Sequence, residues 1–266
     1  MKTPVIDTWK VEEHLVSFIR RAVERSGKEK AVVGLSGGID SATIGALAVR
    51  AMGSSNVIGL LLPYRAGRPE DIRDAQELAD LFGIHTRTID IAPMIDAYFE
   101  HFSRASVMRK GNKMARERMS ILYDWASYHN ALVLGTGNRT EYYMGYFTKY
   151  GDGGVDVEPI GCLYKTEVRQ LAVSIGIPRH LANRTPTAGL WQGQTDEGEL
   201  GFTYQFLDSI LYCMIDLHLG RQSLLQEGFF PDDIDTVRSM VRATRHKRRT
   251  PPIPEFKAEW RKAEEE

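Results

Sequence analysis

The chain has 266 residues, of which 42% are hydrophobic and 26% are charged. Its 34 basic and 35 acidic residues give a formal net charge of -1, which does not favour non-specific binding to nucleic acid or a broadly cationic membrane-binding surface. No apolar run reaches the roughly 20 residues of a membrane-spanning helix, and two cysteines are too few for a disulfide framework. We therefore expect one domain over residues 1–266, in the cytoplasm, with neither nucleic acid nor membrane as a partner.

The first half of the chain alternates helical and strand-like patterns. Strands are predicted over 31–35, 56–62, 85–91 and 131–135, and helices over about 10–25, 41–52, 71–83, 92–103 and 113–129. Such alternation predicts an α/β fold, a parallel β-sheet flanked by helices. Because ligands bind at the carboxyl ends of the strands in such sheets, we expect the functional residues just after residues 35, 62 and 135.

The second half of the chain begins with a polar, glycine-rich segment over 136–164 that has no convincing period. We predict a long functional loop there, without a clear helix. Helices are predicted over 165–176, 195–218 and 232–244, and a C-terminal tail over 245–266 opens with the basic run RHKRR.

The strongest motif is GLSGGIDS, residues 34–41, which lies between a hydrophobic strand and a helix. Its glycines let the backbone approach a ligand closely, and the start of the following helix offers free N–H groups to phosphate oxygens. Ser36 and Ser41 add hydroxyl donors. No GxxxxGK[ST] sequence occurs in the chain, so the motif predicts a phosphate site that differs from the P-loop of kinases and GTPases.

A second motif, LGTGNRTE at 134–141, follows the last predicted strand. It does not match a dinucleotide-binding turn, because Thr140 stands at the third glycine position. Asp40 and Glu141 would lie at the ends of two neighbouring strands, and their carboxylates are the hard oxygen ligands that magnesium prefers. We therefore predict that Asp40 and Glu141 hold magnesium together with phosphate oxygens.

The loop SGGIDS resembles the pyrophosphate-binding loop of the N-type ATP pyrophosphatases. A longer series of motifs closely resembles the family of NH3-dependent NAD synthetases, over roughly residues 10 to 255: NKMARERM (112–119), LGTGNRTE (134–141), GYFTKYGDGGVD (145–156), PIGCLYKTEVRQLA (159–172), PTAGLWQGQTDEGELGFTY (186–204) and HKR (246–248). The resemblance implies a Rossmann-like, adenine nucleotide alpha-hydrolase-like fold. It also implies a ligase that amidates deamido-NAD with ammonia and ATP, through an NAD-adenylate, to give NAD, AMP and pyrophosphate in the last step of NAD biosynthesis.

The resemblance also implies roles for individual residues. The implied ATP-binding residues are Gly34, Leu35, Ser36, Gly37, Gly38, Ile39, Asp40, Ser41, Thr136, Lys165 and Thr187. The implied deamido-NAD-binding residues are Arg116, Lys149, Asp156, His246 and Lys247, and the implied magnesium ligands are again Asp40 and Glu141. No residue is assigned a catalytic role, although Asp152 and Asp196 lie where an acid could accept a proton from ammonium. Cys162 is predicted to be a small buried thiol.

Members of this family are homodimers that bind deamido-NAD across the interface, and the stretch 183–200 resembles their mobile loop. Glutamine-dependent members carry an additional N-terminal amidase domain, whereas only about thirty residues precede the first predicted strand here. We therefore expect a homodimer that uses free ammonia. The run RHKRR has two interpretations, a short nucleic-acid patch or a contact to substrate phosphate, and the match to the family's HK pair favours the second.

Two other functions compete with this hypothesis. One is another ATP pyrophosphatase, such as a GMP synthetase subunit or a tRNA-modifying enzyme, although no CxxC pair is present to support the latter. The other is a nucleotide-binding regulatory protein without turnover, which would keep the glycine loop but would not need Asp40, Glu141 and Lys165 together.

Overall fold

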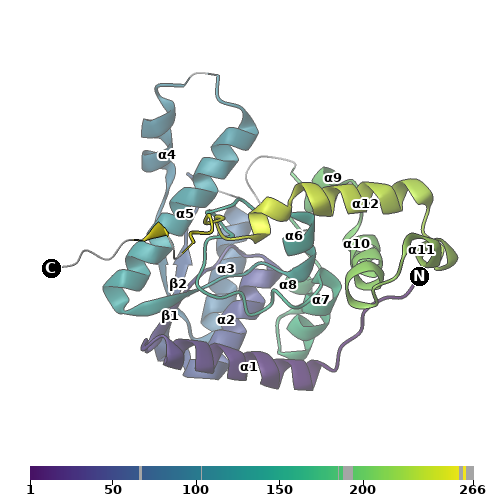
Figure 1. Cartoon of the computed structure of the whole chain (residues 1–266). Helices are drawn as coiled ribbons and strands as arrows, with labels where there is room; N and C mark the ends of the chain where they lie inside the picture. Colours follow the sequence, from purple (N-terminus) through teal and green to yellow (C-terminus); the bar gives the residue numbers. More distant parts are fainter. Residues whose placement is uncertain (66–67, 103, 185, 188–193, 258–259, 262–266) are drawn as a thin grey trace.

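The computed structural model describes residues 1–65, 68–102, 104–184, 186–187, 194–257 and 260–261. Its centre is a parallel sheet surrounded by helices (Figure 1), as the alternation of patterns predicted. The order of the strands is β3-β2-β1-β4. The strands are β1 (Lys30–Gly34), β2 (Val57–Leu61), β3 (His85–Thr88) and β4 (Ala131–Leu134). Val157 extends the sheet by a single parallel bridge to Leu134.

Helices cover both faces of the sheet, so a hydrophobic core lies on each face. Side chains along β1 alternate between these two cores. Ala31 and Val33 point into the core on one face, whereas Val32 points into the core on the other. The first face packs against α1 (Thr8–Arg25), α2 (Ile39–Met52), α3 (Pro69–Phe82), α7 (Lys165–Ser174) and α8 (Arg179–Ala182). The second packs against α4 (Ala92–Phe99) and α5 (Val107–His129), which project beyond the sheet (Figure 1). A short 3-10 turn, η1 (Ser54–Asn56), leads into β2.

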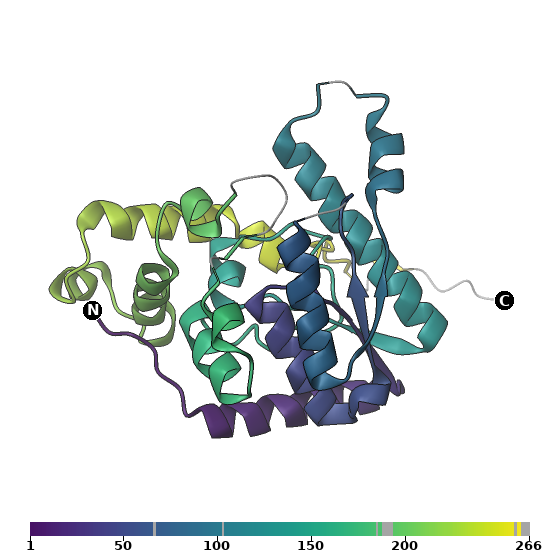
Figure 2. The ribbon, with the colours of Figure 1, turned by 180° about the vertical axis from the view of Figure 1, so that it is seen from behind.

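A helical layer lies beside the sheet and has its own buried cluster around Tyr204 and Leu207; it is formed by α6 (Arg139–Met144) and by helices from the last third of the chain. Its other elements are α9 (Asp196–Leu200), α10 (Tyr204–Leu211), the π-helix η2 (Tyr212–Asp216), α11 (Arg221–Gln226), α12 (Pro231–Ala243) and the 3-10 turn η3 (Arg245–Arg248). The N-terminus lies beside α11 (Figure 2), where Lys2 forms an ion pair with Glu227 at 3.0 Å.

The prediction of a helix-free loop over 136–164 is wrong, because α6 forms inside it. This helix has only six residues, too few for a visible hydrophobic period, and its ends are set by caps. The Asn138 side chain accepts a hydrogen bond from the Glu141 backbone N–H at 3.0 Å, and Glu141 accepts one from the Asn138 N–H at 3.2 Å. This capping box nucleates the helix and places Glu141 in its first turn.

The prediction of one helix over 195–218 is also wrong. Gly201 adopts a left-handed conformation with φ +75° and ends α9, and Thr203 then caps the start of α10. The start of α5 also differs from the prediction: α5 begins at Val107 rather than at 113, because Ser106 caps its first turn.

Cys162 is exposed, not buried as predicted. None of the described helices has the length and apolar character that a membrane-spanning helix needs.

Candidate active site

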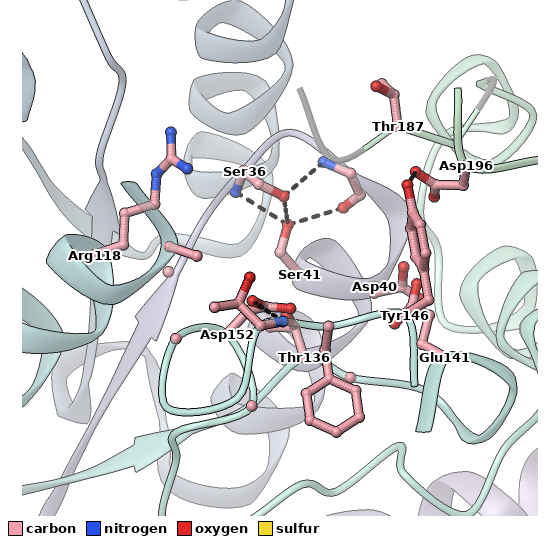
Figure 3. Close-up of a pocket in the computed structure, with 18 of the residues that line it drawn as sticks. Ser36, Asp40, Ser41, Arg118, Thr136, Glu141, Tyr146, Asp152, Thr187 and Asp196 are labelled. Atoms are coloured by element: carbon pink, nitrogen blue, oxygen red, sulfur yellow. Dashed lines mark hydrogen bonds between the residues drawn. The ribbon is translucent and has the colours of Figure 1, made fainter. Parts of the chain in front are cut away.

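A pocket of roughly 800 Å³ opens at the carboxyl ends of β1, β2 and β4 (Figure 3). Its walls include the ends of these three strands and the segments that follow them, residues 34–41, 60–64 and 134–138, so a pocket lies where the functional residues were expected. Its volume is within the range of small-molecule sites, about 300–1,000 Å³.

The segment Gly34–Ser41 forms a tight turn between β1 and α2. The Ser41 hydroxyl accepts a hydrogen bond from the Ser36 N–H at 3.2 Å and donates one to the Gly38 carbonyl at 2.9 Å. Gly38 is the N-cap of α2 and has no side chain to bond the first N–H groups of the helix. The positive end of the α2 dipole therefore faces the pocket without a capping side chain, an arrangement suited to phosphate oxygens.

Gly37 is required in this turn for two reasons. Its φ is +78°, a conformation that other residues rarely adopt, and a Cβ atom at this position would lie 2.4 Å from the Asp71 carbonyl oxygen. Asp71 in turn forms ion pairs with Arg68 and Arg184, and Arg184 also pairs with Asp74. These ion pairs join α3 to the segment after α8, and the phosphate loop packs closely against α3 at Asp71.

The predicted residues Asp40, Glu141 and Lys165 meet at the base of the pocket, as the resemblance implied. Lys165 Nζ forms an ion pair with the Asp40 carboxylate and lies 3.6 Å from Glu141 Oε1. The Lys165 side chain is only 3% exposed, and those of Asp40 and Glu141 are 16% and 17% exposed. The three residues come from the starts of α2, α6 and α7, so three helix N-termini converge on one cluster of charges.

The charges of this cluster are strongly coupled. Burial is the main cause that raises the pKa of Glu141 to about 8; Lys165 opposes this shift and Asp40 contributes to it. Burial by itself lowers the pKa of Lys165, but Asp40 and Glu141 outweigh this effect and raise it above its ordinary value. Lys165 therefore stays protonated, and a second cation beside the carboxylates would be needed to keep Glu141 fully ionised at neutral pH.

The sequence reasoning did not assign Asp196, Tyr204 and Tyr146 to this cluster. The Tyr204 hydroxyl donates to Asp196 Oδ2 at 3.0 Å and lies 3.4 Å from Glu141 Oε1. The Tyr146 hydroxyl donates to Asp196 Oδ1 at 3.1 Å. Burial raises the pKa of Asp196, against the attraction of Lys165. The acidic run TDEGEL was a usable signal for Asp196, but nothing local marks a tyrosine eight residues later as part of a site.

The donor set fits a magnesium ion that is held in part by phosphate. No group of three His, Cys, Asp or Glu side chains among the described residues is arranged as a complete protein cage for a metal. Magnesium sites at nucleotides commonly use only one or two carboxylates and take the remaining oxygens from phosphate and water. Burial and the neighbouring carboxylates Asp40 and Asp196 all disfavour the ionised form of Glu141, so a cation at Asp40 and Glu141 would stabilise both carboxylates.

Two threonines and one lysine from the prediction also line the pocket: Thr136, Thr187 and Lys247. Lys247 Nζ donates to the carbonyl oxygens of Gly145 and Phe147 at 2.7 and 2.8 Å, which fixes the loop after α6. Part of the predicted mobile loop over 183–200, residues 185 and 188–193, lies outside the described residues.

The other predicted deamido-NAD residues do not line this pocket. Arg116 Nε donates to the Lys149 carbonyl at 3.3 Å, and Lys149 Nζ donates to the His246 carbonyl at 3.1 Å, so these three residues form one cluster outside the pocket. Asp156 lies apart from them beside β4, where it accepts hydrogen bonds from Tyr123 and from the Val133 N–H. The fold brings three of these four residues together and leaves Asp156 separate.

A different wall of the pocket carries charged residues that the sequence reasoning left unassigned. Arg118 lies opposite Asp196 (Figure 3), and its Nε donates to the Leu62 carbonyl at 2.9 Å. Glu158 packs against Gly135 and Gly137, where a Cβ atom on Gly137 would lie 3.2 Å from its carboxylate. Burial, together with neighbouring Asp152, raises the pKa of Glu158 to about 7. The glycines of the GTG motif thus make room for a carboxylate.

Comparison with known proteins gives a consistent result. The model of the NAD synthase family matches residues 11–251. The chain is 45% identical to the NH(3)-dependent NAD(+) synthetase of Trichlorobacter lovleyi over 248 residues, which is 93% of this chain and 91% of that protein. It is 43% identical to the protein of the same name from Fusobacterium nucleatum, over 93% of this chain and 96% of that one.

Solved structures give the same fold. An NMN synthetase from Francisella tularensis superposes with a TM-score of 0.82 at 34% identity, covering 95% of this chain and all of that one. An NH3-dependent NAD synthetase from Campylobacter jejuni superposes with a TM-score of 0.81 at 30% identity, covering 94% of this chain and all of that one.

Proposed function

Because the chain belongs to the NAD synthase family, we propose that its pocket binds ATP with the phosphates on Gly34–Ser41 and binds deamido-NAD beside it. As a member of this family the chain is a ligase that forms a C–N bond. Its reaction joins ammonia to the nicotinate carboxylate of deamido-NAD with ATP, in the last step of NAD biosynthesis.

The reaction needs two steps, because a carboxylate is a poor electrophile. A carboxylate oxygen of deamido-NAD attacks the α-phosphorus of ATP, the bond to the β-phosphate oxygen breaks, and pyrophosphate leaves. Ammonia then adds to the carbonyl carbon of the adenylate, AMP leaves with the C–O bond electrons, and the nitrogen loses a proton to give the amide. Both steps need the pocket to stabilise phosphate charge and to exclude water.

The observation that carries the proposal is the buried cluster of Asp40, Glu141 and Lys165 beside the phosphate loop. We assign Lys165 to the phosphates of ATP, since its ammonium is the one cation buried in this cluster of described residues. Ser36, Ser41 and the first N–H groups of α2 would orient the same phosphates. Thr136 and Thr187, which line the pocket, complete the proposed ATP site.

We assign Asp40 and Glu141 to magnesium. When bound, the ion supplies positive charge that offsets the charge developing on the phosphates. Lys165, which pairs with Asp40 in this structure, would then be available to contact phosphate. The Tyr204 hydroxyl, which donates to Asp196 and lies 3.4 Å from Glu141 Oε1, would help to orient the Glu141 carboxylate.

We further propose that the chain acts as a homodimer with deamido-NAD bound across the interface. Support comes from the cluster of Arg116, Lys149 and His246, which lies outside the pocket of its own chain. A dinucleotide that extends from one pocket to a second copy would meet such a cluster, and Asp156 and Lys247 would belong to the same shared site. Light scattering of the purified protein measures the dimer directly.

We propose free ammonia as the nitrogen donor, a single catalytic domain over residues 1–266 with 245–266 as its tail, and a cytoplasmic location. The names of the relatives, which describe them as NH(3)-dependent, support ammonia as the nitrogen donor. The two free cysteines, Cys162 and Cys213, are consistent with a reducing compartment.

The test is an assay of the purified protein with ATP, magnesium, ammonium and deamido-NAD. Equal amounts of NAD, AMP and pyrophosphate are expected, with far less product when glutamine replaces ammonium. If folded protein releases no AMP while calorimetry shows ATP binding, the chain is a binding protein and the proposal is wrong. Turnover of XMP in place of deamido-NAD would indicate a GMP synthetase activity instead.

A second candidate substrate is nicotinate mononucleotide, which the likeness to the NMN synthetase of Francisella tularensis favours. The two substrates share the nicotinate carboxylate and differ in the adenylate half of the dinucleotide. A ratio of kcat/KM above 1 for deamido-NAD over nicotinate mononucleotide supports the first candidate, and a ratio below 1 supports the second.

A further inference from the structure

A second hollow, distinct from the main pocket, lies between α6, η2, α12 and η3 and has a volume of roughly 590 Å³. We call it the arginine hollow, because five of its lining residues are arginines: Arg238, Arg242, Arg245, Arg248 and Arg249. The basic run RHKRR is thus divided by the fold. Lys247 lines the main pocket, whereas Arg245, Arg248 and Arg249 line the arginine hollow.

The described residues provide no carboxylate partner for the arginines of the hollow. None of its five arginines forms an ion pair with a carboxylate of the described part of the chain. The acidic neighbour on α12, Asp235, is paired with Arg221 at 2.9 Å and attracts Arg238 only from a distance. Like charges four residues apart destabilise a helix, so a cluster of this kind is unfavourable in the absence of a ligand.

Arg248 forms the rigid floor of the hollow. Its Nη1 donates to the carbonyl oxygens of Tyr142 and Tyr143 at 3.2 and 2.8 Å and to Thr244 Oγ1 at 2.8 Å. These carbonyls belong to the last turn of α6, whose negative dipole end favours a cation. Among the described residues, no such hydrogen bonds hold the remaining four arginines of the lining. Arg238 and Arg242 lie one turn apart on α12, Arg245 lies in η3, and Arg249 follows η3 in extended backbone.

The chemistry of the lining indicates the class of ligand. Guanidinium groups bind phosphate through two parallel hydrogen bonds, and several of them around one hollow match a ligand with several negative charges. The volume is that of a small-molecule site rather than of a groove along a nucleic acid. Tyr142, a residue that is 37% exposed, offers an aromatic face beside the charges.

We propose that the arginine hollow binds a small oligophosphate, either free or carried by a nucleotide, at a site separate from the main pocket. This inference does not depend on the proposed function, because none of the five arginines belongs to the proposed ATP, magnesium or deamido-NAD sites.

The test is calorimetric titration with inorganic tripolyphosphate in magnesium-free buffer. The parent chain is expected to bind one tripolyphosphate in the arginine hollow, in addition to any that binds at the phosphate loop. In the variant Arg242→Gln/Arg245→Gln, the affinity of this additional binding event should fall at least tenfold. Binding at the phosphate loop persists in both proteins and serves as the internal reference. The variant Arg242→Lys/Arg245→Lys, which keeps the charge but not the two-pronged geometry, should lose less. If the Gln variant unfolds at a lower temperature than the parent, Arg245→Gln/Arg249→Gln replaces it.

The matched control is Arg25→Gln/Arg87→Gln, which removes the same charge from exposed arginines far from the hollow. Equal weakening by this control shows a general charge effect and overturns the proposal, as do identical titrations of parent and Arg242→Gln/Arg245→Gln. If added deamido-NAD abolishes the additional tripolyphosphate binding, the hollow belongs to the dinucleotide site, and this result also overturns the proposal. The same holds if a single-stranded RNA binds and tripolyphosphate does not. Tighter binding of CTP than of tripolyphosphate identifies a nucleotide as the ligand, and the reverse order identifies a free oligophosphate.

Discussion

Lys165 and Asp40, which are 125 residues apart in the sequence, form an ion pair at the base of the pocket with the lysine side chain only 3% exposed. The pair joins the first turn of α7 to the first turn of α2. Glu141 on α6 completes the cluster at 3.6 Å from the lysine. Three elements of the fold are therefore tied together by the same charges that we assign to ATP and magnesium.

Lys165→Met is expected to lower the unfolding free energy by about 3–5 kcal/mol above pH 8, because two buried carboxylates lose their counter-charge. The loss should be smaller at pH 6, where a protonated Glu141 no longer repels Asp40. Urea denaturation at the two pH values measures the difference. Lys10→Met, which removes an exposed pair with Asp7, should leave stability nearly unchanged. Equal effects of the two variants would contradict a buried role for Lys165.

Asp40→Asn and Glu141→Gln should each raise the magnesium concentration needed for half-maximal turnover by at least about tenfold, since each removes a charged oxygen ligand. Chelation of magnesium by EDTA should abolish turnover in the parent protein, and added magnesium should restore it. The exposed substitution Glu29→Gln serves as the control and should leave the magnesium titration unchanged. Unaltered magnesium dependence in both site variants would exclude these two carboxylates as ligands.

Gly37→Ala should weaken ATP binding at least tenfold. The new Cβ atom would meet the Asp71 carbonyl at 2.4 Å in a backbone conformation with φ +78°, so the turn has to shift away from the phosphates. Gly27→Ala is the matched control, because Gly27 has φ +67° but no atom within 4 Å of the added Cβ. That control should cost about 1 kcal/mol of stability and leave ATP affinity intact. Calorimetric titration of both variants with ATP is the measurement. A loss of ATP affinity in Gly37→Ala but not in Gly27→Ala indicates that the loop is displaced, whereas an equal loss in both indicates backbone strain alone.

Glu158→Gln should stabilise the protein at pH 8 and have little effect at pH 5. The pKa of Glu158 rises from 4.5 to about 7 on folding, so the folded state binds its proton more tightly than the unfolded state. Its ionisation therefore destabilises the fold progressively as the pH rises from about 4.5 to 7, by up to about 3 kcal/mol. Glutamine cannot ionise and removes this dependence. The check is the difference in unfolding free energy between variant and parent across this pH range, and a flat difference would refute the prediction.

Asp208→Ala should lower the unfolding free energy by about 2–4 kcal/mol. The buried Asp208 carboxylate accepts hydrogen bonds from the Thr140 hydroxyl and, at 2.7 Å, from the Thr166 N–H, so it joins α10 to the starts of α6 and α7. Its removal leaves both donors without a partner. Ser209→Ala on the same helix removes only a bond to the Gln205 carbonyl of that helix and should cost less than about 1 kcal/mol. Chemical denaturation of both variants makes the comparison.

Local patterns in the sequence were sufficient for the sheet and for the phosphate loop. The hydrophobic run 31–35 marks its strand, although the pairing with β2 and β4 is long-range. The hydroxyls of 34–41 shape the turn before α2 through hydrogen bonds that span only a few residues. The order of strands and helices then predicted that Asp40 and Glu141 would lie near each other at neighbouring strand ends. Local reasoning was wrong at α6 and at Gly201, where a cap and a left-handed glycine outweigh hydrophobic periodicity.

The amino-acid sequence by itself therefore determined the fold class, the phosphate turn and the residue types that the chemistry needs. Only the tertiary structure decided which of these residues meet. It buried Lys165 between two carboxylates, placed Tyr204 and Asp196 beside Glu141, and separated Lys247 from the arginines that flank it in sequence. The physical reason is that a charge acquires its partner and its pKa from residues far away in the chain, through packing that no local pattern records.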